Sequence, residues 1–231
     1  MRTVELSGPI ASTGRLGGVA AAPDGSLFVT SFASSVWRIT FPDGPEGVAE
    51  VERVATDFAL ASGNAVDASG RLYQSDFQRN QIRALDPDGW SVIADSGLNG
   101  PVGLAVGPEG ELYVTNFDND RIVRVDPEGH AEVWAVVGPG SGNAQLARVG
   151  DALYVTKIGT NELFLVRGPD DVALVAGTGE TGLDDGPGLE ATLARPNGIA
   201  TVGSVLYMNN LDGVWRSGKP CELVMRRVVI E

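Results

Sequence analysis

The feature that most limits how this chain can fold is an aromatic residue that recurs inside short strand-like segments. The segments SLFVTS, RLYQSD, ELYVTN, ALYVTK and VLYMNN align on Phe28, Tyr73, Tyr113, Tyr154 and Tyr207. Successive aromatic residues are 45, 40, 41 and 53 positions apart, each with a glycine shortly upstream and a proline-containing turn downstream. Repeats of about 40 residues that contain only strands predict a β-propeller with one four-stranded blade per repeat.

The repeats span nearly the whole chain. We expect an all-β fold with five four-stranded blades, in a single propeller domain over residues 1–231. The blades cover about Gly17 to Ala59, 60–97, 98–138, Gly142 to Ala176, and Pro196 to the end. A composition of 43% hydrophobic residues with 31 glycines and 13 prolines suits a fold with many tight turns.

Two segments leave alternatives open. Thr3–Leu6 and Cys221–Ile230 are both candidates for the outer strand of the last blade, and the sequence does not choose between them. The segment 177–195, GTGETGLDDGPGLEATLAR, lengthens the fourth interval, and Leu189–Leu193 within it could form one helical turn. It is either an extended connection packed on the ring or a flap over the central opening, since long loops often serve function.

The charge and the ends of the chain narrow the function classes. A formal net charge of −13 argues against a surface for nucleic acid or anionic membrane, so we expect neither as a partner. One cysteine excludes a disulfide within the chain. The sequence has no secretory signal and no apolar run long enough to cross a membrane, which predicts a cytoplasmic protein. A small-molecule ligand is the expected partner, and the oligomeric state is left open.

The expected topology gathers certain side chains at one end of the propeller. In a four-stranded blade, the loop that leads into the first strand and the loop after the second strand emerge on the same face. The position three residues after the aromatic holds a different polar residue in each repeat, namely Ser31, Asp76, Asn116, Lys157 and Asn210. Asn64 and Asn197 lie near first-strand starts.

These residues have two interpretations. Asn and Asp after a strand often only terminate it. As a set they predict a site at the solvated central mouth of the propeller, with Asp76 and Lys157 as a catalytic pair and with Asn64, Asn116, Asn197 and Asn210 as substrate-binding groups. A desolvated Lys157 would act as a base or nucleophile. The same oxygens could bind Ca²⁺ or Mg²⁺, but only weakly, because Asp76 is the only carboxylate among them.

The only histidine excludes some common sites. His130 follows the turn DPEG at 126–129, which lies on the opposite face and should leave the side chain at the surface. A Ser-His-Asp triad or a histidine-rich metal centre is therefore not expected on the face that carries the polar series.

The repeat resembles a known family. PVGLAVGPEGELYVTNFDNDRIVRVDPEG is similar to an NHL repeat, and GTGETGLDDGPGLEATLARPNGIA resembles the linker and strand start of NHL-repeat proteins. The pattern is shared with SMP-30/gluconolactonase-like and virginiamycin-B-lyase-like propellers. The resemblance implies a propeller commonly of six blades, which is the alternative to five, and in the first group a divalent metal held by Glu and Asn/Asp.

The resemblance carries over to few residues. Asn197 in RPNG matches the metal-binding Asn of the family, and Asn64 lies one residue out of register with another. Gly17 and Gly18 stand where the family has a Glu, and the lyase histidine has no counterpart. The expected function is a small-molecule enzyme, either a lactonase-like hydrolase or a lyase or cyclase. The alternative is a non-catalytic propeller that binds a ligand or a protein.

Overall fold

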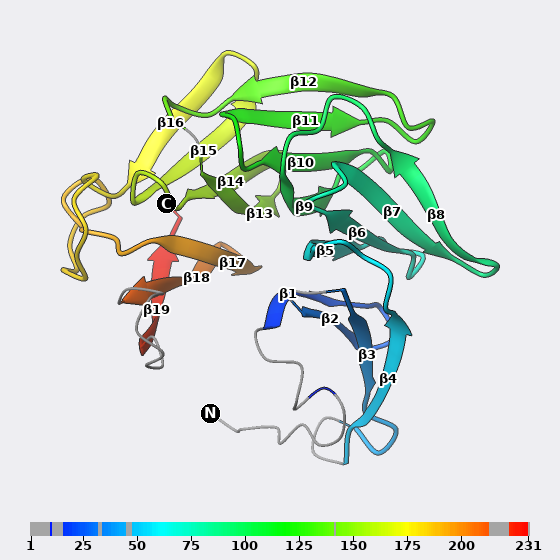
Figure 1. The fold of residues 1–231 in the computed structure, drawn as a ribbon. Helices are drawn as coiled ribbons and strands as arrows, with labels where there is room; N and C mark the ends of the chain where they lie inside the picture. Colours follow the sequence, from blue (N-terminus) through cyan, green and yellow to red (C-terminus); the bar gives the residue numbers. More distant parts are fainter. Residues whose placement is uncertain are drawn as a thin grey trace. The chain divides into compact units, whose positions relative to one another are not determined.

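The described part of the chain consists of strands and turns (Figure 1). The computed structural model describes residues 10, 16–31, 34–44, 48–140, 142–212 and 222–230. None of these residues lies in an α-helix, so no described helix is a candidate to cross a membrane. The strands form five antiparallel sheets in chain order, which confirms the predicted all-β propeller fold with five blades.

Four of the blades have four strands each. The first two consist of β1 (Leu16–Ala21), β2 (Leu27–Ser31), β3 (Val36–Thr40), β4 (Glu50–Ala55), β5 (Ala61–Val66), β6 (Leu72–Asp76), β7 (Gln81–Asp86) and β8 (Gly89–Ala94). The next two consist of β9 (Pro101–Val106), β10 (Leu112–Asn116), β11 (Arg121–Val125), β12 (Ala131–Val136), β13 (Asn143–Val149), β14 (Ala152–Lys157), β15 (Glu162–Gly168) and β16 (Asp171–Ala176). Each strand pairs with the next along the chain, as expected for a meander.

The fifth blade corrects one prediction. Its sheet has the order β17 (Pro196–Val202), β18 (Val205–Asp212), β19 (Glu222–Val229). Cys221–Ile230 was expected as an outer fourth strand, but β19 pairs with β18 along its whole length and is the third strand. Third and fourth strands share the same alternating pattern, so the sequence could not separate them. The other candidate, Thr3–Leu6, lies outside the described residues.

The structure divides into two compact units. One comprises residues 1–112 and 125–131, and the other residues 113–124 and 132–231. Within the first unit β1 packs on β5 and β5 on β9, and within the second β13 packs on β17. First strands of consecutive blades thus lie side by side, as in a propeller. The prediction of one single domain stays a prediction.

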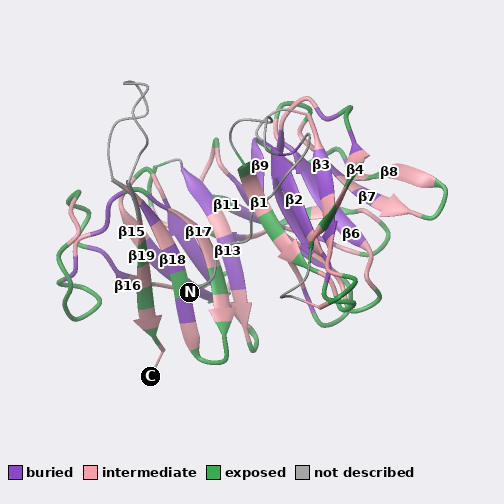
Figure 2. Cartoon of the chain, turned by 90° about the horizontal axis from the view of Figure 1, so that it is seen from below, coloured by how far each residue is buried: buried purple, intermediate pink, exposed green. Residues whose placement is uncertain are grey.

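Burial is greatest in the second strands of the blades. β2 and β6 are mostly buried, whereas the fourth strand β8 is mostly of intermediate exposure (Figure 2). Two of the repeated aromatic residues fill the space between neighbouring sheets. Phe28 belongs to a cluster with Leu72, and Tyr154 to a cluster with Leu206 and Met208 of the following blade. The repeat therefore marks the contact from one blade to the next.

The segment 177–195 folds back on its own unit. Thr181 and Leu193 form an isolated parallel bridge, and the Ala191 amide donates to the Pro187 carbonyl in a single turn. This turn lies slightly earlier than the helical turn expected at Leu189–Leu193. Leu193 is 1% exposed and packs into the cluster between the fourth and fifth sheets. The contacts match the packed connection rather than a flap.

Candidate functional site

Four of the five polar residues of the repeat end their second strands, Asn210 lies two residues before the end of β18, and all five are buried. Ser31 is 1% exposed, and Asp76, Asn116, Lys157 and Asn210 are 0% exposed. A solvated position was expected for this series, and that expectation is wrong. In the first, second, fourth and fifth blades, the residue pairs with the start of the first strand, and a β-bulge follows at once. The pairing places the side chain beneath the preceding loop.

Asp76 fastens the loop that leads into its own blade. Its carboxylate accepts hydrogen bonds from the amides of Ala59 at 3.1 Å and Leu60 at 3.2 Å. Arg79 adds an ion pair at 2.9 Å, with its own side chain 46% exposed. A buried carboxylate that accepts two backbone hydrogen bonds and an arginine has its charge compensated locally. Asp76 therefore holds the loop at Ala59 and Leu60 against the end of β6.

Lys157 holds the corresponding loop of the fourth blade with the opposite polarity. Its ammonium donates to the Val137 carbonyl at 2.6 Å, and its only ion-pair partner in the described structure, Asp120, is 3.5 Å away. The Val137 amide in turn donates to the Asp120 carbonyl. Burial lowers the pKa of Lys157, and the Asp120 carboxylate offsets part of this shift. The amine is therefore easier to deprotonate than an ordinary lysine.

One buried amide side chain lies opposite Lys157, and a second lies elsewhere in the same unit. Asn143 starts β13 directly opposite Lys157, is 0% exposed, and has no hydrogen-bond partner in the structure for its side-chain nitrogen or oxygen. The side chain of Asn210 in β18 is likewise 0% exposed and has no hydrogen-bond partner in the structure. The sequence pattern pointed to Asn210 but not to Asn143. The available signal for Asn143 was a polar residue at the start of an expected strand.

The other predicted site residues have separate surroundings. Asp76 and Asn64 belong to the first unit, where the Asn64 amide donates to the Phe28 carbonyl at 3.1 Å. Asn197 follows the start of β17, and its carbonyl accepts a hydrogen bond from Thr156. Asn116 ends β10 and is completely buried. The roles predicted for these residues in substrate binding stay predictions.

A hydroxyl residue one position before the polar series escaped the sequence analysis. Each donates to a main-chain carbonyl of the next blade: Thr30 to Ser62, Ser75 to Val102, Thr115 to Ala144, and Thr156 to Asn197. The fifth repeat has Asn209 instead, whose side chain accepts from Gly198 of its own blade. The recurrence of Thr or Ser two residues after the aromatic was the available signal.

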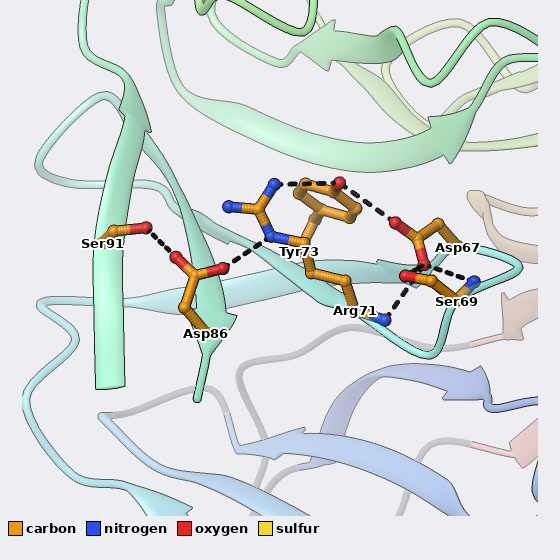
Figure 3. Close-up of polar contacts among 6 residues, drawn as sticks. All are labelled: Asp67, Ser69, Arg71, Tyr73, Asp86 and Ser91. Atoms are coloured by element: carbon orange, nitrogen blue, oxygen red, sulfur yellow. Dashed lines mark hydrogen bonds and ion pairs between the residues drawn. The ribbon is translucent and has the colours of Figure 1, made fainter. Parts of the chain in front are cut away.

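A second polar cluster lies at the other end of the second blade (Figure 3). Arg71 bridges the Asp86 carboxylate at 2.8 Å and stacks over the Tyr73 ring, with its guanidinium carbon 5.2 Å from the centroid. Hydrogen bonds from Ser91 and Arg71 lower the pKa of Asp86. The Tyr73 hydroxyl donates to Asp67 at 3.2 Å, so the cluster is closed by its own members. It stabilises the turns of one blade rather than offering free groups.

His130 is where the sequence analysis placed it. Its side chain is 82% exposed and contacts Asp126 in the turn after β11. The position confirms that His130 is a surface residue.

The metal implied by the family resemblance does not fit the residues present. A Cβ atom added at Gly18 would stand 2.8 Å from the Ser62 carbonyl oxygen, so the acidic ligand expected near this position has no room there. Asn64 uses its amide nitrogen to bind the main chain. Among the described residues, no group of three or more His, Cys, Asp or Glu side chains could hold a metal ion. We therefore derive no chemistry through a metal.

A comparison with known protein families identifies the type of one repeat. The NHL repeat profile matches residues 98–125, which cover β9, β10 and β11. The chain is a β-propeller that contains an NHL-type repeat. The match confirms the family resemblance at the stretch that carried it. A search of curated protein sequences found no significant match to the whole chain.

Solved structures share the fold at low sequence identity. A gluconolactonase from Xanthomonas campestris is 20% identical with a TM-score of 0.66, over 86% of this chain and 71% of its own. Virginiamycin B lyase from Staphylococcus aureus, with quinupristin, is 18% identical with a TM-score of 0.65, over 88% and 64%. An auxiliary nutrient binding protein from Bacteroides ovatus is 16% identical with a TM-score of 0.73, over 85% and 53%.

These neighbours combine one fold with several activities. The NHL-type chain spans less than two thirds of the length of the lyase and of the nutrient binding protein. Two of the three neighbours are enzymes and the third is a binding protein. At such identities the likeness establishes the propeller fold and leaves the activity to the residues of this chain.

Proposed function

We propose that this NHL-type propeller is an enzyme that acts on a small polar metabolite, with Lys157 as its reactive amine. The observation that carries the proposal is a completely buried lysine whose nearest carboxylate, Asp120, is 3.5 Å away. Buried lysines with a lowered pKa are a common device for base and nucleophilic catalysis. The gluconolactonase and lyase neighbours support a hydrolase or a lyase on this fold.

Hydrolysis of a lactone would require one general base and a hydrogen-bond donor to the ring carbonyl oxygen. The neutral amine of Lys157 would take a proton from water as the water oxygen attacks the ring carbonyl. The ring oxygen would leave and recover that proton, so that a hydroxy acid is formed and the amine is regenerated. The unpartnered amide of Asn143, opposite Lys157, is suited to donate a hydrogen bond to the carbonyl oxygen as charge develops on it.

The test uses a panel of small lactones and three variants. The chain contains two lysines, Lys157 and Lys219, so Lys219→Arg is a matched control for chemistry at an amine. Lys157→Met should lower turnover by about 100-fold or more, the usual contribution of a general base. Lys157→Arg should lose as much, because a guanidinium stays protonated. Full activity in Lys157→Met, with Lys219→Arg equally active, would contradict the proposal.

A second candidate is non-catalytic ligand binding. It is favoured by Asp76, whose carboxylate is occupied by Ala59, Leu60 and Arg79 and so is less suited to catalysis. The nutrient binding neighbour has the same fold. The two functions separate in one measurement, since a binding protein releases its ligand unchanged after incubation, whereas an enzyme converts it.

A further inference from the structure

Two places in the chain carry a dipeptide that can change chemically without an enzyme. Asparagine followed by glycine occurs at Asn99–Gly100 and at Asn197–Gly198. The amide nitrogen of the glycine can attack the side-chain carbonyl carbon of the asparagine, because glycine has no Cβ atom to obstruct the approach. The reaction needs the two atoms in a near-attack geometry, so the local structure decides its rate.

The reaction needs no reactant other than water. The glycine amide gives up its proton, its nitrogen bonds to the asparagine Cγ, and the side-chain nitrogen leaves with a proton as ammonia. Water then opens the resulting succinimide ring by breaking one of the two bonds between a ring carbonyl carbon and the nitrogen. The product is aspartate or isoaspartate. Both add a negative charge, and isoaspartate also adds a methylene group to the main chain.

The peptide group between Asn197 and Gly198 is held at both ends. It lies in the β-bulge at the start of β17, where the pairing with β18 is interrupted. The Gly198 amide donates to the side-chain oxygen of Asn209 at 2.7 Å. The Asn197 carbonyl accepts from the Thr156 hydroxyl at 2.6 Å. The nitrogen keeps its proton in a hydrogen bond and the peptide cannot rotate freely, so both contacts oppose attack on the Asn197 side chain.

The residue that holds Gly198 differs from its counterpart in the second blade. There the aligned residue is Ser75, whose hydroxyl accepts from the Gly63 amide at 2.9 Å. The longer side chain of Asn209 makes a shorter hydrogen bond and also packs on the glycine, since a Cβ atom at Gly198 would stand 3.3 Å from the Asn209 side-chain nitrogen. Asn209 therefore covers the reacting amide as well as binding it.

The peptide group between Asn99 and Gly100 is held less firmly. The Gly100 amide donates to the side-chain oxygen of Asn80, also at 2.7 Å. Asn80 lies in a turn rather than in a strand, has a positive φ of 51°, and donates its own amide to the Phe77 carbonyl only at 3.4 Å. Asn99 is exposed, whereas Asn197 is half-buried. An exposed side chain changes rotamer freely, so Asn99 reaches the attack geometry more often.

We propose that Asn99 is a site of spontaneous deamidation and that Asn209 protects Asn197 from the same reaction. Asn80 and Asn209 are positioning residues, each of which slows the reaction at one site by binding the glycine amide. Protection matters most at Asn197, because its carbonyl joins the fifth blade to Thr156 of the fourth. An isoaspartate there would lengthen the main chain at a contact between two blades.

The test follows both sites in the full chain during incubation in mildly alkaline buffer. Peptide mapping by mass spectrometry measures the asparagine, aspartate and isoaspartate forms at each position. In the folded protein Asn99 should be converted at least about tenfold faster than Asn197, the ratio expected when one additional hydrogen bond must break before attack. In guanidinium chloride the two rates should converge, because the dipeptide is the same and the contacts are lost.

Two pairs of variants assign each rate to its positioning residue. Asn209→Ala should speed conversion of Asn197 by about tenfold and leave Asn99 unchanged, and Asn80→Ala should have the opposite selectivity. Asn209→Asp and Asn80→Asp keep an acceptor oxygen for the glycine amide, so each should restore the slow rate at its own site. Hydrogen exchange of the Gly198 amide should follow the same order among the Asn209 variants.

The proposal is wrong if Asn99 and Asn197 react at equal rates in the folded wild-type chain, a result that requires no variant to fold. It is also wrong if Asn99 stays intact in the folded chain while the denatured chain is converted. A folded Asn209→Ala variant, checked by circular dichroism, in which Asn197 reacts no faster would remove Asn209 as the protecting residue.

Discussion

Asp76 in the second blade and Lys157 in the fourth occupy the same position of the repeat and have the same structural role. Each ends the second strand, is fully buried, and bonds the main chain of the loop that leads into its own blade. Asp76 accepts from amides of its loop, and Lys157 donates to a carbonyl of its loop. The opposite charges of these two residues therefore match the backbone group that each loop turns inward.

The two clamps differ in how completely their charge is compensated. Asp76 has two backbone donors and an arginine at 2.9 Å, whereas Lys157 has one carbonyl and a carboxylate at 3.5 Å. An ion removed from water with incomplete compensation raises the free energy of its charged form. The comparison teaches that two residues with one structural role can differ in how well their charge is compensated, and the less compensated Lys157 is the one that we propose as the reactive group.

The largest expected effect on stability comes from removing the carboxylate of Asp76, whose charge is compensated by two amides and an arginine. Asp76→Ala leaves the amides of Ala59 and Leu60 without their acceptor, which should lower the free energy of unfolding by about 3 kcal/mol. Asp57→Ala is the control, since Asp57 is 62% exposed in its ion pair with Arg83 and should contribute less than about 1 kcal/mol. Urea denaturation measures both. Equal losses of unfolding free energy in the two variants would contradict the role of Asp76 in holding its loop.

The hydroxyl bonds between blades should have the next largest effect. Thr156 donates to the Asn197 carbonyl at 2.6 Å and accepts from the Gln145 amide at 3.1 Å. Thr156→Val keeps the shape of the side chain but leaves the Asn197 carbonyl and the Gln145 amide without this partner. The free energy of unfolding should therefore fall by about 2 kcal/mol. Thr156→Ser, which retains the hydroxyl, should lose clearly less in the same denaturation series. If Ser and Val cost the same, the packing of the methyl group, not the hydrogen bond, stabilises this contact.

A smaller effect should appear as a dependence of stability on alkaline pH. Burial lowers the pKa of Lys157 in the folded protein below the ordinary lysine value of 10.5, so between these two pKa values the unfolded chain binds the proton more tightly. The free energy of unfolding should therefore rise with pH across that interval, relative to Lys157→Met, which has no such group. A difference between the two proteins that stays flat or falls up to pH 10.5 would contradict uncompensated burial.

The smallest expected effect concerns divalent metal. Because Gly18 has no room for an acidic side chain and Asp76 is already engaged, calorimetry with Ca²⁺ or Mg²⁺ should show no site tighter than about 0.1 mM. Asn197→Ala should leave this result unchanged. A sub-micromolar site that disappears in Asn197→Ala would restore the metal centre implied by the resemblance, and would bring Asn197 into the mechanism.

The sequence was sufficient for the fold because the repeat reports contacts between blades. Phe28 and Tyr154 are buried against the next sheet, so their spacing counts blades directly. The position of β19 was not predictable, because a third and a fourth strand have the same alternation. The exposure of the polar series was mistaken for a similar reason, since the β-bulge that turns Asp76 and Lys157 inward leaves no mark in their own identity.

The account depends most directly on the protonation of one amine. In Lys219→Arg the chain carries a single lysine side chain, so labelled lysine gives one signal from Lys157 in an NMR titration. We predict that the chemical shift of the carbon beside its amine follows a pKa below the ordinary lysine value of 10.5, with that ordinary value recovered in denaturant. A pKa at or above 10.5 in the folded protein would mean that Lys157 is only a clamp, like Asp76.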